Sequence, residues 1–264
     1  MKNFFKPIFI IFIIFILTTF FSFKVFSAED TNKLLSTDWS FKGFTGKFDR
    51  ASLQRGYQVY TEVCASCHSM KLLSYRNLGE EGGPEFSKDQ VKAIASSFEV
   101  TDGPNNDGEM FTRPAKPSDN FVKPYQNVQE ATVSNGGAYP PDMSVLVKAR
   151  SGGANYIYSL LLGYDEPPSN IQLDDGVYYN TYMPGNKIMM PNPLSEDLIE
   201  YNDGTKATNE QMAKDVVTFL AWAAEPHLEA RHRIGFKAII YLIILTLLAY
   251  FSMKRLWSRI EPKV

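Results

Sequence analysis

Cysteine and histidine are scarce in this chain. Only two of its 264 residues are cysteines and three are histidines. A structural zinc site needs four ligands, commonly two cysteine pairs or one pair with distant histidines. The chain has no cysteine besides Cys64 and Cys67, and two of its histidines, His227 and His232, adjoin a long apolar run near the C-terminus. The scarcity of thiols and imidazoles therefore argues against structural zinc.

Acidic residues and arginine are absent from the first 28 residues, which contain three lysines. An uncharged run from Pro7 to Phe23 is followed by the small residues Ser27 and Ala28. A basic start, an apolar middle and a small-residue end are typical of a secretory signal, whereas a mitochondrial transit peptide would be rich in arginine. We predict that residues 1–28 are a cleaved signal peptide. An uncleaved anchor is the alternative, because the apolar run is longer than the usual signal core.

A second apolar run extends from Ile234 to Met253. A helix needs about 20 mostly apolar residues to cross a hydrocarbon core of ~30 Å, and this run is long enough. Its one charge, Lys237, stands near an end, where the side chain can reach the membrane surface. We predict a transmembrane anchor over residues 231–253 and a cytoplasmic tail over residues 254–264, whose excess of basic residues agrees with the positive-inside rule.

Charge is distributed unevenly along the chain. The whole sequence has a net charge of −2, but residues 29–230 contain 17 basic and 28 acidic residues, a net charge of −11. We predict that this segment is an extracytoplasmic domain. Such an acidic domain repels nucleic acid and attracts a basic partner, mainly by accelerating the encounter. The alternative is that the acidic surface serves only solubility.

Helical spacing of apolar residues dominates the predicted domain, and no internal repeat is evident. Asp49, Ser87 and Thr208 each precede a helical pattern and suit the N-cap position. The predicted helices cover residues 49–68, 87–98, 140–150, 154–164 and 208–225. Residues 100–125 and 163–207 are longer than ordinary connections and are predicted to be irregular loops, which are often functional.

The stretch Cys64-Ala65-Ser66-Cys67-His68 contains both thiols of the chain. A redox-active cysteine pair would be expected beside a βαβ pattern, which the sequence lacks. A plain structural disulfide in an exported domain is a further alternative. Cys-x-x-Cys-His is the signature of covalent c-type haem attachment. We predict that Cys64 and Cys67 form thioether bonds to one haem c and that His68 is an axial ligand of its iron.

The sixth iron ligand is predicted to be a methionine, the usual partner of histidine in c-type electron carriers. The candidates in the domain are Met70, Met110, Met143, Met183, Met189, Met190 and Met212. Met70 is too close to His68 to reach the opposite face of a haem. The Pro-rich stretch "NTYMPGNKIMMPNPLSE" is the best place to present a thioether, but spacing does not choose among Met183, Met189 and Met190.

Several ordered segments resemble the cytochrome c1 family, and the resemblance covers nearly all of the chain after the predicted signal. They are "RGYQVYTEVCASCHSMKLLSYRNL", "NGGAYPPDMSVLVKARSGGANYIYSLLLGY", "MPGNKIMMPNPL" and "EYNDGTKATNEQMAKDVVTFLAWAAEPHLEARHRIGFK". The resemblance implies that Met190 is the axial methionine, with Met189 as second choice. It also implies that Arg150 lies near a haem propionate, where a charge-assisted hydrogen bond suits an arginine.

The fold implied is mostly α: a cytochrome c-like haem domain with long irregular loops and one C-terminal transmembrane helix. The family resemblance further implies an electron-carrier subunit of a quinol–cytochrome c reductase (cytochrome bc1 complex), with no substrate chemistry of its own. The implied partners are cytochrome b, the Rieske iron–sulfur subunit and a basic soluble cytochrome c. The complex would be dimeric and lie in a bacterial inner membrane, with the haem domain in the periplasm.

Two other functions remain as alternatives at this point. A membrane-anchored thiol–disulfide oxidoreductase would use Cys64 and Cys67 as a reducible pair without a chromophore. A stand-alone membrane-anchored c-type cytochrome would serve another oxidase or dehydrogenase, and it would purify without cytochrome b or a Rieske protein.

Overall fold

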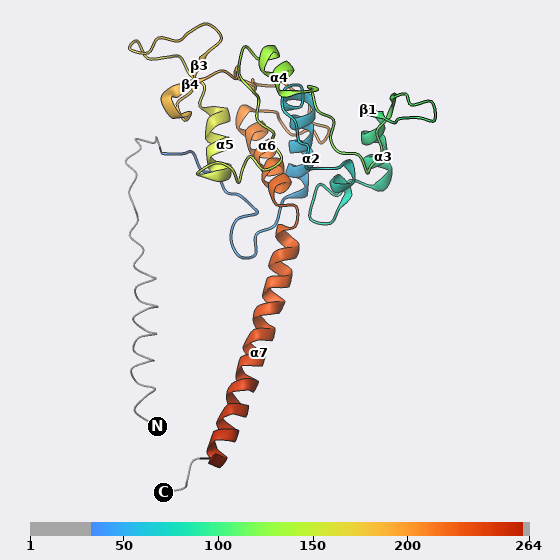
Figure 1. Ribbon diagram of the computed structural model, residues 1–264. Helices are drawn as coiled ribbons and strands as arrows, with labels where there is room; N and C mark the ends of the chain where they lie inside the picture. The colour runs from blue at the N-terminus through green and yellow to red at the C-terminus, as the bar shows by residue number, and fades with distance from the viewer. Residues whose placement is uncertain (1–32, 261–264) are drawn as a thin grey trace. The chain divides into compact units, whose positions relative to one another are not determined.

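The computed structural model describes residues 33–260, which form a helical head followed by one long helix (Figure 1). The predicted signal peptide, residues 1–28, lies outside the described residues.

Two helices far apart in sequence form the centre of the head. Helix α2, Arg50–Val59, packs against α6, Asn209–Ala224. Gly56 makes this close approach possible, because a Cβ atom there would lie 2.1 Å from the carbonyl oxygen of Asp215. Any larger residue at position 56 would force the two helices apart.

The predicted N-caps are confirmed. The Asp49 carboxylate accepts a hydrogen bond from the Ser52 amide at the start of α2. Ser87 and Thr208 do the same for α3, Lys88–Ser96, and for α6. These side chains satisfy amides that the helix itself leaves unpaired.

One predicted helix is wrong. Residues 140–150 form turns rather than a helix, whereas the next predicted helix, at residues 154–164, is present as α5, Gly153–Leu162. The physical reason is that Asp142 and Ser144 use their side chains to accept hydrogen bonds from the backbone of residues 71 and 72. Helix α4, Val128–Ser134, was not predicted.

The long connections contain short regular elements. Strands β1, Glu99–Asp102, and β2, Phe111–Pro114, form an antiparallel hairpin in which Glu99 pairs with Pro114. Strands β3, Tyr178–Tyr179, and β4, Lys187–Ile188, form a smaller one. Two short 3₁₀ turns are also present: η2, Tyr75–Gly79, and η3, Pro184–Asn186. The mostly α prediction holds, with these hairpins as additions.

Aromatic side chains from both central helices build much of the core. The Tyr57 ring of α2 lies 5.7 Å from Phe219 of α6, in an edge-on arrangement. Tyr60 lies 5.8 Å from Phe219 and 6.1 Å from Phe121. Edge-on and tilted pairs at these separations are favourable for aromatic rings. This cluster supports the chain just before Cys64.

A buried ion pair also joins α2 to α6. Arg55 Nε donates to Asp215 Oδ2 at 2.8 Å, and the Asp215 side chain is fully buried. Gln211 donates to the same carboxylate oxygen at 2.8 Å. A second partner of Arg55, Asp203, is 45% exposed. The buried carboxylate is therefore fully supplied with hydrogen bonds, as a buried charge requires.

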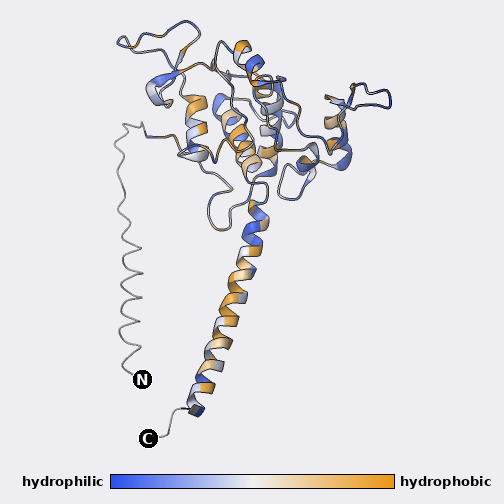
Figure 2. Ribbon diagram, in the orientation of Figure 1, coloured by the Kyte–Doolittle hydropathy of each residue, from blue (hydrophilic) through white to orange (hydrophobic). Residues whose placement is uncertain are grey.

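Helix α7, Leu228–Ile260, leaves the head as a single rod. Within residues 33–260 it supplies the one helix, Leu228–Arg259, that is long and apolar enough to cross a membrane. Figure 2 shows polar residues at its start and apolar ones along its middle. It covers the predicted anchor at 231–253 and extends beyond both ends of it.

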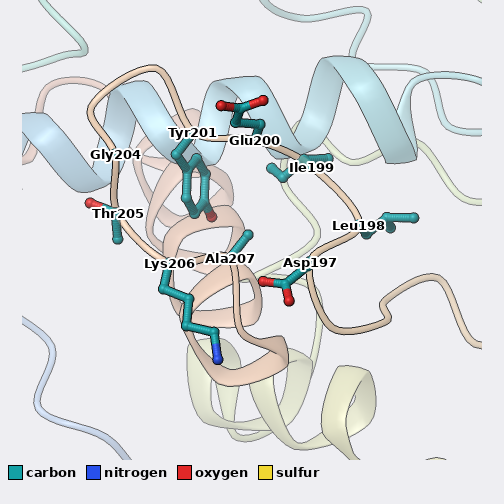
Figure 3. Close-up of a pocket in the computed structure, with 9 residues that line it drawn as sticks. All are labelled: Asp197, Leu198, Ile199, Glu200, Tyr201, Gly204, Thr205, Lys206 and Ala207. Carbon is teal, nitrogen blue, oxygen red and sulfur yellow. The ribbon is translucent and has the colours of Figure 1, made fainter.

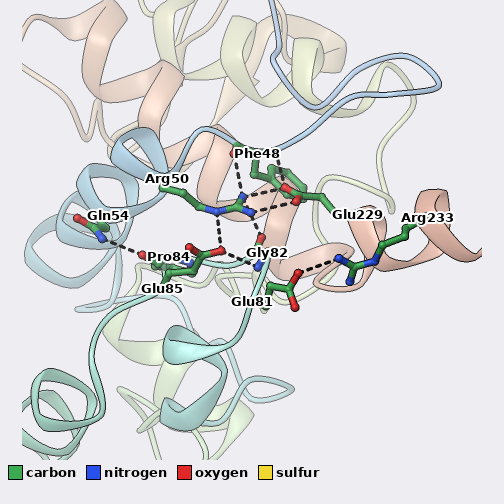
Figure 4. A network of polar contacts seen from close by, with 9 residues as sticks. All are labelled: Phe48, Arg50, Gln54, Glu81, Gly82, Pro84, Glu85, Glu229 and Arg233. Carbon is green, nitrogen blue, oxygen red and sulfur yellow. Dashed lines mark hydrogen bonds and ion pairs between the residues drawn. The ribbon is translucent and has the colours of Figure 1, made fainter.

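Ion pairs connect the head to the first turns of α7 (Figure 4). Arg50 donates to both carboxylate oxygens of Glu229, at 2.8 and 3.0 Å, and its Nε pairs with Glu85 at 2.8 Å. The Phe48 amide also donates to Glu229, at 2.9 Å. Arg233 pairs with Glu81 at 2.8 Å. A bidentate arginine–carboxylate pair fixes geometry as well as charge, so this network sets the direction in which α7 leaves the head.

Candidate functional site

The Cys-x-x-Cys-His stretch follows directly from α2. The connection is a π-helical turn, η1 at Tyr60–Cys64, which ends at the first cysteine of the motif and in which the Ala65 amide donates to the Tyr60 carbonyl. Such turns occur most often at functional sites. The amides of Cys67 and His68 both donate to the Cys64 carbonyl, at 3.1 and 2.9 Å. Both thiols and the imidazole are thus held on one tight turn, as the motif predicts.

His68 is buried, and its ring is oriented by a segment far along the chain. Nδ1 lies 2.8 Å from the carbonyl oxygen of Pro141. A carbonyl only accepts, so the neutral imidazole carries its proton on Nδ1 and leaves Nε2 as the lone-pair nitrogen. No hydrogen bond joins Nε2 to any residue between 33 and 260. Burial lowers the pKa of His68, against the raising effects of Pro141 and Asp142, which favours the neutral form that a metal requires.

The Pro141 segment is fastened to the chain that follows His68. The Asp142 carboxylate accepts from the Ser69 hydroxyl at 2.7 Å and from the Lys71 amide at 3.1 Å. The Met143 amide donates to the Ser69 carbonyl at 2.8 Å. Burial alone would raise the pKa of Asp142, but these hydrogen bonds and those from Ser144 outweigh it and lower the pKa. The carboxylate is charged at neutral pH and holds the carbonyl of Pro141 in place.

The properties of the thiols argue against a redox pair. Both cysteines are free and half-buried. Burial, with a smaller contribution from Cys67, raises the pKa of the Cys64 thiol to about 12. Catalytic thiols of oxidoreductases need the opposite shift, because the thiolate is the nucleophile. In the described part of the chain no cluster of three or more His, Cys, Asp or Glu residues could hold a metal ion, which also disfavours zinc.

The structure separates the candidate methionines by environment. Met70, Met143 and Met212 are buried in the core, and Met110 is 61% exposed beside the β1–β2 hairpin. A methionine buried in the core usually fills space between apolar side chains and does not bind a metal.

The three methionines of the Pro-rich stretch differ from one another. The Sδ atom of Met183 accepts a hydrogen bond from the Tyr156 hydroxyl at 3.7 Å. Met189 is 39% exposed, and its methyl carbon lies near Gly136. Met190 is half-buried, and its carbonyl accepts a hydrogen bond from the Tyr164 hydroxyl at 3.0 Å. Met190 therefore combines partial burial with a fixed backbone, and no hydrogen bond in the described chain occupies its sulfur.

Arg150 is exposed, and its guanidinium donates to the neighbouring Ala149 carbonyl at 3.2 Å. Among the polar contacts of the described residues, none joins Arg150 or Met190 to the turn that holds His68. Their roles toward a haem thus stay predictions.

The residues present fit a covalently attached haem. Two thiols one turn apart can form two thioether bonds. In the adjoining imidazole of His68, Nδ1 is held by the Pro141 carbonyl, and Nε2 has no hydrogen-bond partner in the described chain. Orientation of a ligand imidazole by a backbone carbonyl is a common arrangement at metal centres.

Sequence reasoning placed Pro141 and Asp142 in a segment that resembles the family, but it assigned neither residue a role at the site. A backbone carbonyl carries no side-chain signal, so the hydrogen bond from His68 could be found only in the structure. The Tyr60 hydroxyl also donates to a backbone carbonyl, that of His68, at 3.3 Å.

A surface cavity of about 490 Å³ lies elsewhere, inside the loop before α6 (Figure 3). Its lining comes from one segment, residues 197–201 and 204–207, and includes none of the predicted haem residues. The buried Tyr201 ring lies in this loop with the Arg55 guanidinium 5.8 Å from its centre. This packing gives the loop a structural role beside the Arg55–Asp215 pair.

Comparison with known proteins adds an independent finding. The model of the "Cytochrome C1 family" matches residues 39–260. "Cytochrome c1" of Rhodospirillum rubrum is 45% identical over 85% of this chain and 87% of its own length. "Cytochrome b-c1 complex catalytic subunit, mitochondrial" of Candida albicans is 47% identical, over 86% and 78% of the two lengths. "Cytochrome b/c1" of Bradyrhizobium diazoefficiens is 46% identical over 87% of this chain, which spans only 36% of that protein.

Proposed function

The chain belongs to the cytochrome c1 family, and from this premise we propose that it is the haem-carrying electron-transfer subunit of a cytochrome bc1 complex. The single observation that carries the proposal is the ordered Cys64–His68 turn, whose imidazole is fixed by the Pro141 carbonyl. The names of two relatives, "Cytochrome b-c1 complex catalytic subunit, mitochondrial" and "Cytochrome b/c1", support membership of such a complex.

We assign one covalently bound haem c to this chain. Cys64 and Cys67 would hold it through thioether bonds, His68 would bind its iron through Nε2, and Met190 would supply the second iron ligand through its thioether sulfur. Arg150 is assigned to a propionate. When bound, the haem supplies a one-electron couple between ferric and ferrous iron. The chain supplies no acid, base or nucleophile; it tunes the potential through ligand type, burial and hydrogen bonds.

The role of the Pro141 segment is to hold the proton of His68 on Nδ1. With that proton donated to a carbonyl, Nε2 keeps a lone pair directed away from Pro141. Asp142 fixes the carbonyl by tying its own segment to Ser69 and Lys71. These contacts keep the imidazole in one orientation while the charge on the iron changes.

We propose that the Rieske iron–sulfur subunit donates the electron and that a basic soluble cytochrome c accepts it. The net charge of −11 over residues 29–230 supports a basic acceptor, because opposite charge accelerates encounter. Quinol oxidation would take place elsewhere in the complex, in which cytochrome b is the other membrane partner. The whole complex would be a dimer.

The proposed placement is a bacterial inner membrane, with residues 29–230 in the periplasm, an anchor over residues 231–253 and residues 254–264 in the cytoplasm. The helix Leu228–Arg259 supports a single crossing by its length and composition, and the bacterial relative from Rhodospirillum rubrum supports the setting.

Affinity purification of the tagged chain from native membranes in mild detergent tests the proposal. We expect cytochrome b and a Rieske protein to co-purify, with antimycin-sensitive reduction of cytochrome c by a quinol. A covalent haem protein that purifies without either subunit would support the stand-alone carrier instead. A chain without covalent haem would overturn both.

A further inference from the structure

A short loop between the start of the described chain and α2 is closed on itself. It comprises Ser40–Lys47 and is called the neck loop below. The Lys47 amide donates to the Ser40 carbonyl at 3.0 Å and so closes its ends. Gly46 permits this closure, because a Cβ atom there would lie 2.3 Å from the Phe41 carbonyl oxygen. The loop therefore has a defined shape.

The two phenylalanines of the neck loop point in opposite directions. Phe41 faces the core, with its ring centre 5.5 Å from Trp39 and 5.1 Å from Phe48. Phe44 is 64% exposed. Gly43, at φ +88°, supplies the left-handed turn that precedes it. A single exposed apolar side chain is common on protein surfaces, so exposure alone assigns Phe44 no role; its position and the charges beside it do.

The neck loop lies level with the start of the membrane helix. The Phe44 ring stacks on His232 of α7 at 6.4 Å between centres, and Figure 1 shows the loop extending from the head toward the start of α7. His232 precedes Ile234, the first residue of the apolar run, by two positions. At 1.5 Å per residue this is about 3 Å along the helix axis. The headgroup layer is roughly 5–7 Å thick on each side, so Phe44 falls within it.

Positive charge surrounds Phe44, although the domain as a whole is acidic. The nearby carboxylates Glu81, Glu225 and Glu229 are each ion-paired with a cation. Arg231 and Arg233 belong to these pairs, so the exposed basic residues of the neck loop and of the first turns of α7 that lie outside the ion pairs of the described chain are Lys42, Lys47 and Lys237. The Lys42 ammonium also donates to Asn155 Oδ1 at 3.3 Å. Lysines and arginines at this level of a membrane protein attract anionic headgroups.

We propose that the neck loop is a second membrane contact, in which Phe44 inserts among the headgroups and Lys42 and Lys47 bind the phosphates of anionic phospholipids. The proposal rests on the proposed membrane crossing of α7. With α7 at one point and the loop at another, the head would be held at two points on the bilayer surface. This would restrict its tilt and keep the haem turn at a constant distance from the membrane.

A protein subunit is the other candidate to cover this surface. The composition favours lipid, because protein interfaces are depleted in lysine and enriched in arginine, and both cations of the loop are lysines. An interfacial aromatic flanked by lysines is instead the pattern of membrane-surface anchors.

The experiment uses the full holoprotein in nanodiscs of phosphatidylcholine, with and without phosphatidylglycerol. If haem occupies both native cysteines, Phe44→Cys supplies the one thiol that a nitroxide reagent can label. Accessibility to oxygen, which partitions into lipid, is compared with accessibility to a water-soluble nickel chelate. Val133→Cys, at an 81% exposed position of α4, is the aqueous control, and Leu248→Cys, 60% exposed within the apolar run, is the lipid control. Thr45→Cys provides a second label on the loop.

We expect labels at positions 44 and 45 to be protected from the nickel chelate relative to position 133, and more strongly in the anionic discs. A lysine near an anionic surface contributes about fivefold in binding. Lys47→Gln should therefore reduce, by about that factor, the additional protection from the nickel chelate that phosphatidylglycerol gives. Equal nickel accessibility at positions 44 and 133 would overturn the proposal. Protection that arises only in the assembled complex would also overturn it, because a subunit would then cover the loop.

The same labels also test the two assignments on which the proposal depends, the membrane crossing of α7 and the haem on Cys64 and Cys67. A label at position 248 that is accessible to nickel would mean that α7 does not cross the bilayer. Labelling by three nitroxides per chain instead of one would mean that Cys64 and Cys67 carry no haem.

Discussion

The Nδ1 atom of His68 lies 2.8 Å from the carbonyl oxygen of Pro141, a residue 73 positions further along the chain. This contact links the Cys-x-x-Cys-His motif to a segment that only the family resemblance singles out. It fixes the plane and the proton of the imidazole at once. The carboxylate of Asp142, next to Pro141, holds the segment in place through Ser69 and Lys71.

Asp142→Asn should weaken this fastening. The Ser69 hydroxyl and the Lys71 amide both donate to Oδ2, whereas the Ser144 amide donates to Oδ1. An amide has only one accepting oxygen, so at least one of these three donors would lose its partner. We expect the free energy of unfolding of the holoprotein to fall by about 1–3 kcal/mol, the usual cost of a buried donor left unpaired. Chemical denaturation followed by haem absorbance measures it. Asp175→Asn, on an exposed loop, is the matched control and should change little.

The same carboxylate predicts a pH dependence. The pKa of Asp142 is lowered in the folded protein, so its contribution to stability is complete above the ordinary aspartate pKa of about 4 and is lost as the pH falls through the lower folded value. Unfolding measured between pH 6 and pH 3 should show a steeper acid loss for the native chain than for Asp142→Asn. Parallel curves would contradict this role.

The buried pair between α2 and α6 should dominate the stability of the head. Asp215→Ala removes the fully buried partner of Arg55 and leaves that guanidinium paired only with the exposed Asp203, and the expected loss is about 3 kcal/mol. Asp203→Ala removes the exposed partner of the same arginine and should cost at most about 1 kcal/mol. Thermal and denaturant unfolding of the two variants gives the comparison. Similar losses in both would show that burial does not control the energetics of this pair.

Met190→Leu should keep the haem covalently attached but lower its reduction potential. Axial ligands set haem potentials over a range of ~0.8 V, and loss of a thioether is expected to lower the potential by the order of 0.2 V. Redox titration of purified protein measures the shift. Met189→Leu is the matched control on the adjacent residue and should leave the potential nearly unchanged. A reversal of the two results would assign the ligand to Met189.

Electron transfer to a basic cytochrome c should slow as ionic strength rises. The Debye length shortens from about 10 Å at 0.1 M salt to about 3 Å at 1 M, which removes the attraction of an acidic surface. Stopped-flow rates across that range, with an acidic cytochrome c as the control acceptor, test it. A flat profile for the basic acceptor would mean that the net charge of −11 over residues 29–230 serves only solubility.

Local signals made much of the fold predictable. Asp49, Ser87 and Thr208 occupy the N-cap positions assigned to them, because capping depends on residues two or three positions away. The prediction failed at residues 140–150, where the side chains of Asp142 and Ser144 bind a distant backbone instead of continuing a helix. A pattern of apolar residues contains no information about such partners.

In the site, too, the residues set by local spacing were predictable and the distant contacts were not. Cys64, Cys67 and His68 were predictable because their chemistry depends on spacing within one turn. The partner of His68 was not, since a carbonyl oxygen of Pro141 looks like any other in a sequence. Met190 and Arg150 come from the family resemblance and remain predictions.

A pyridine haemochrome assay on the detergent-extracted protein, with its oxidised and reduced absorption spectra, tests the central claim most directly. The account predicts one haem per chain that resists acid–acetone extraction, and a weak near-infrared band of the oxidised form that indicates methionine ligation. A chain without covalent haem, and with Cys64 and Cys67 both reactive toward thiol reagents, would contradict it.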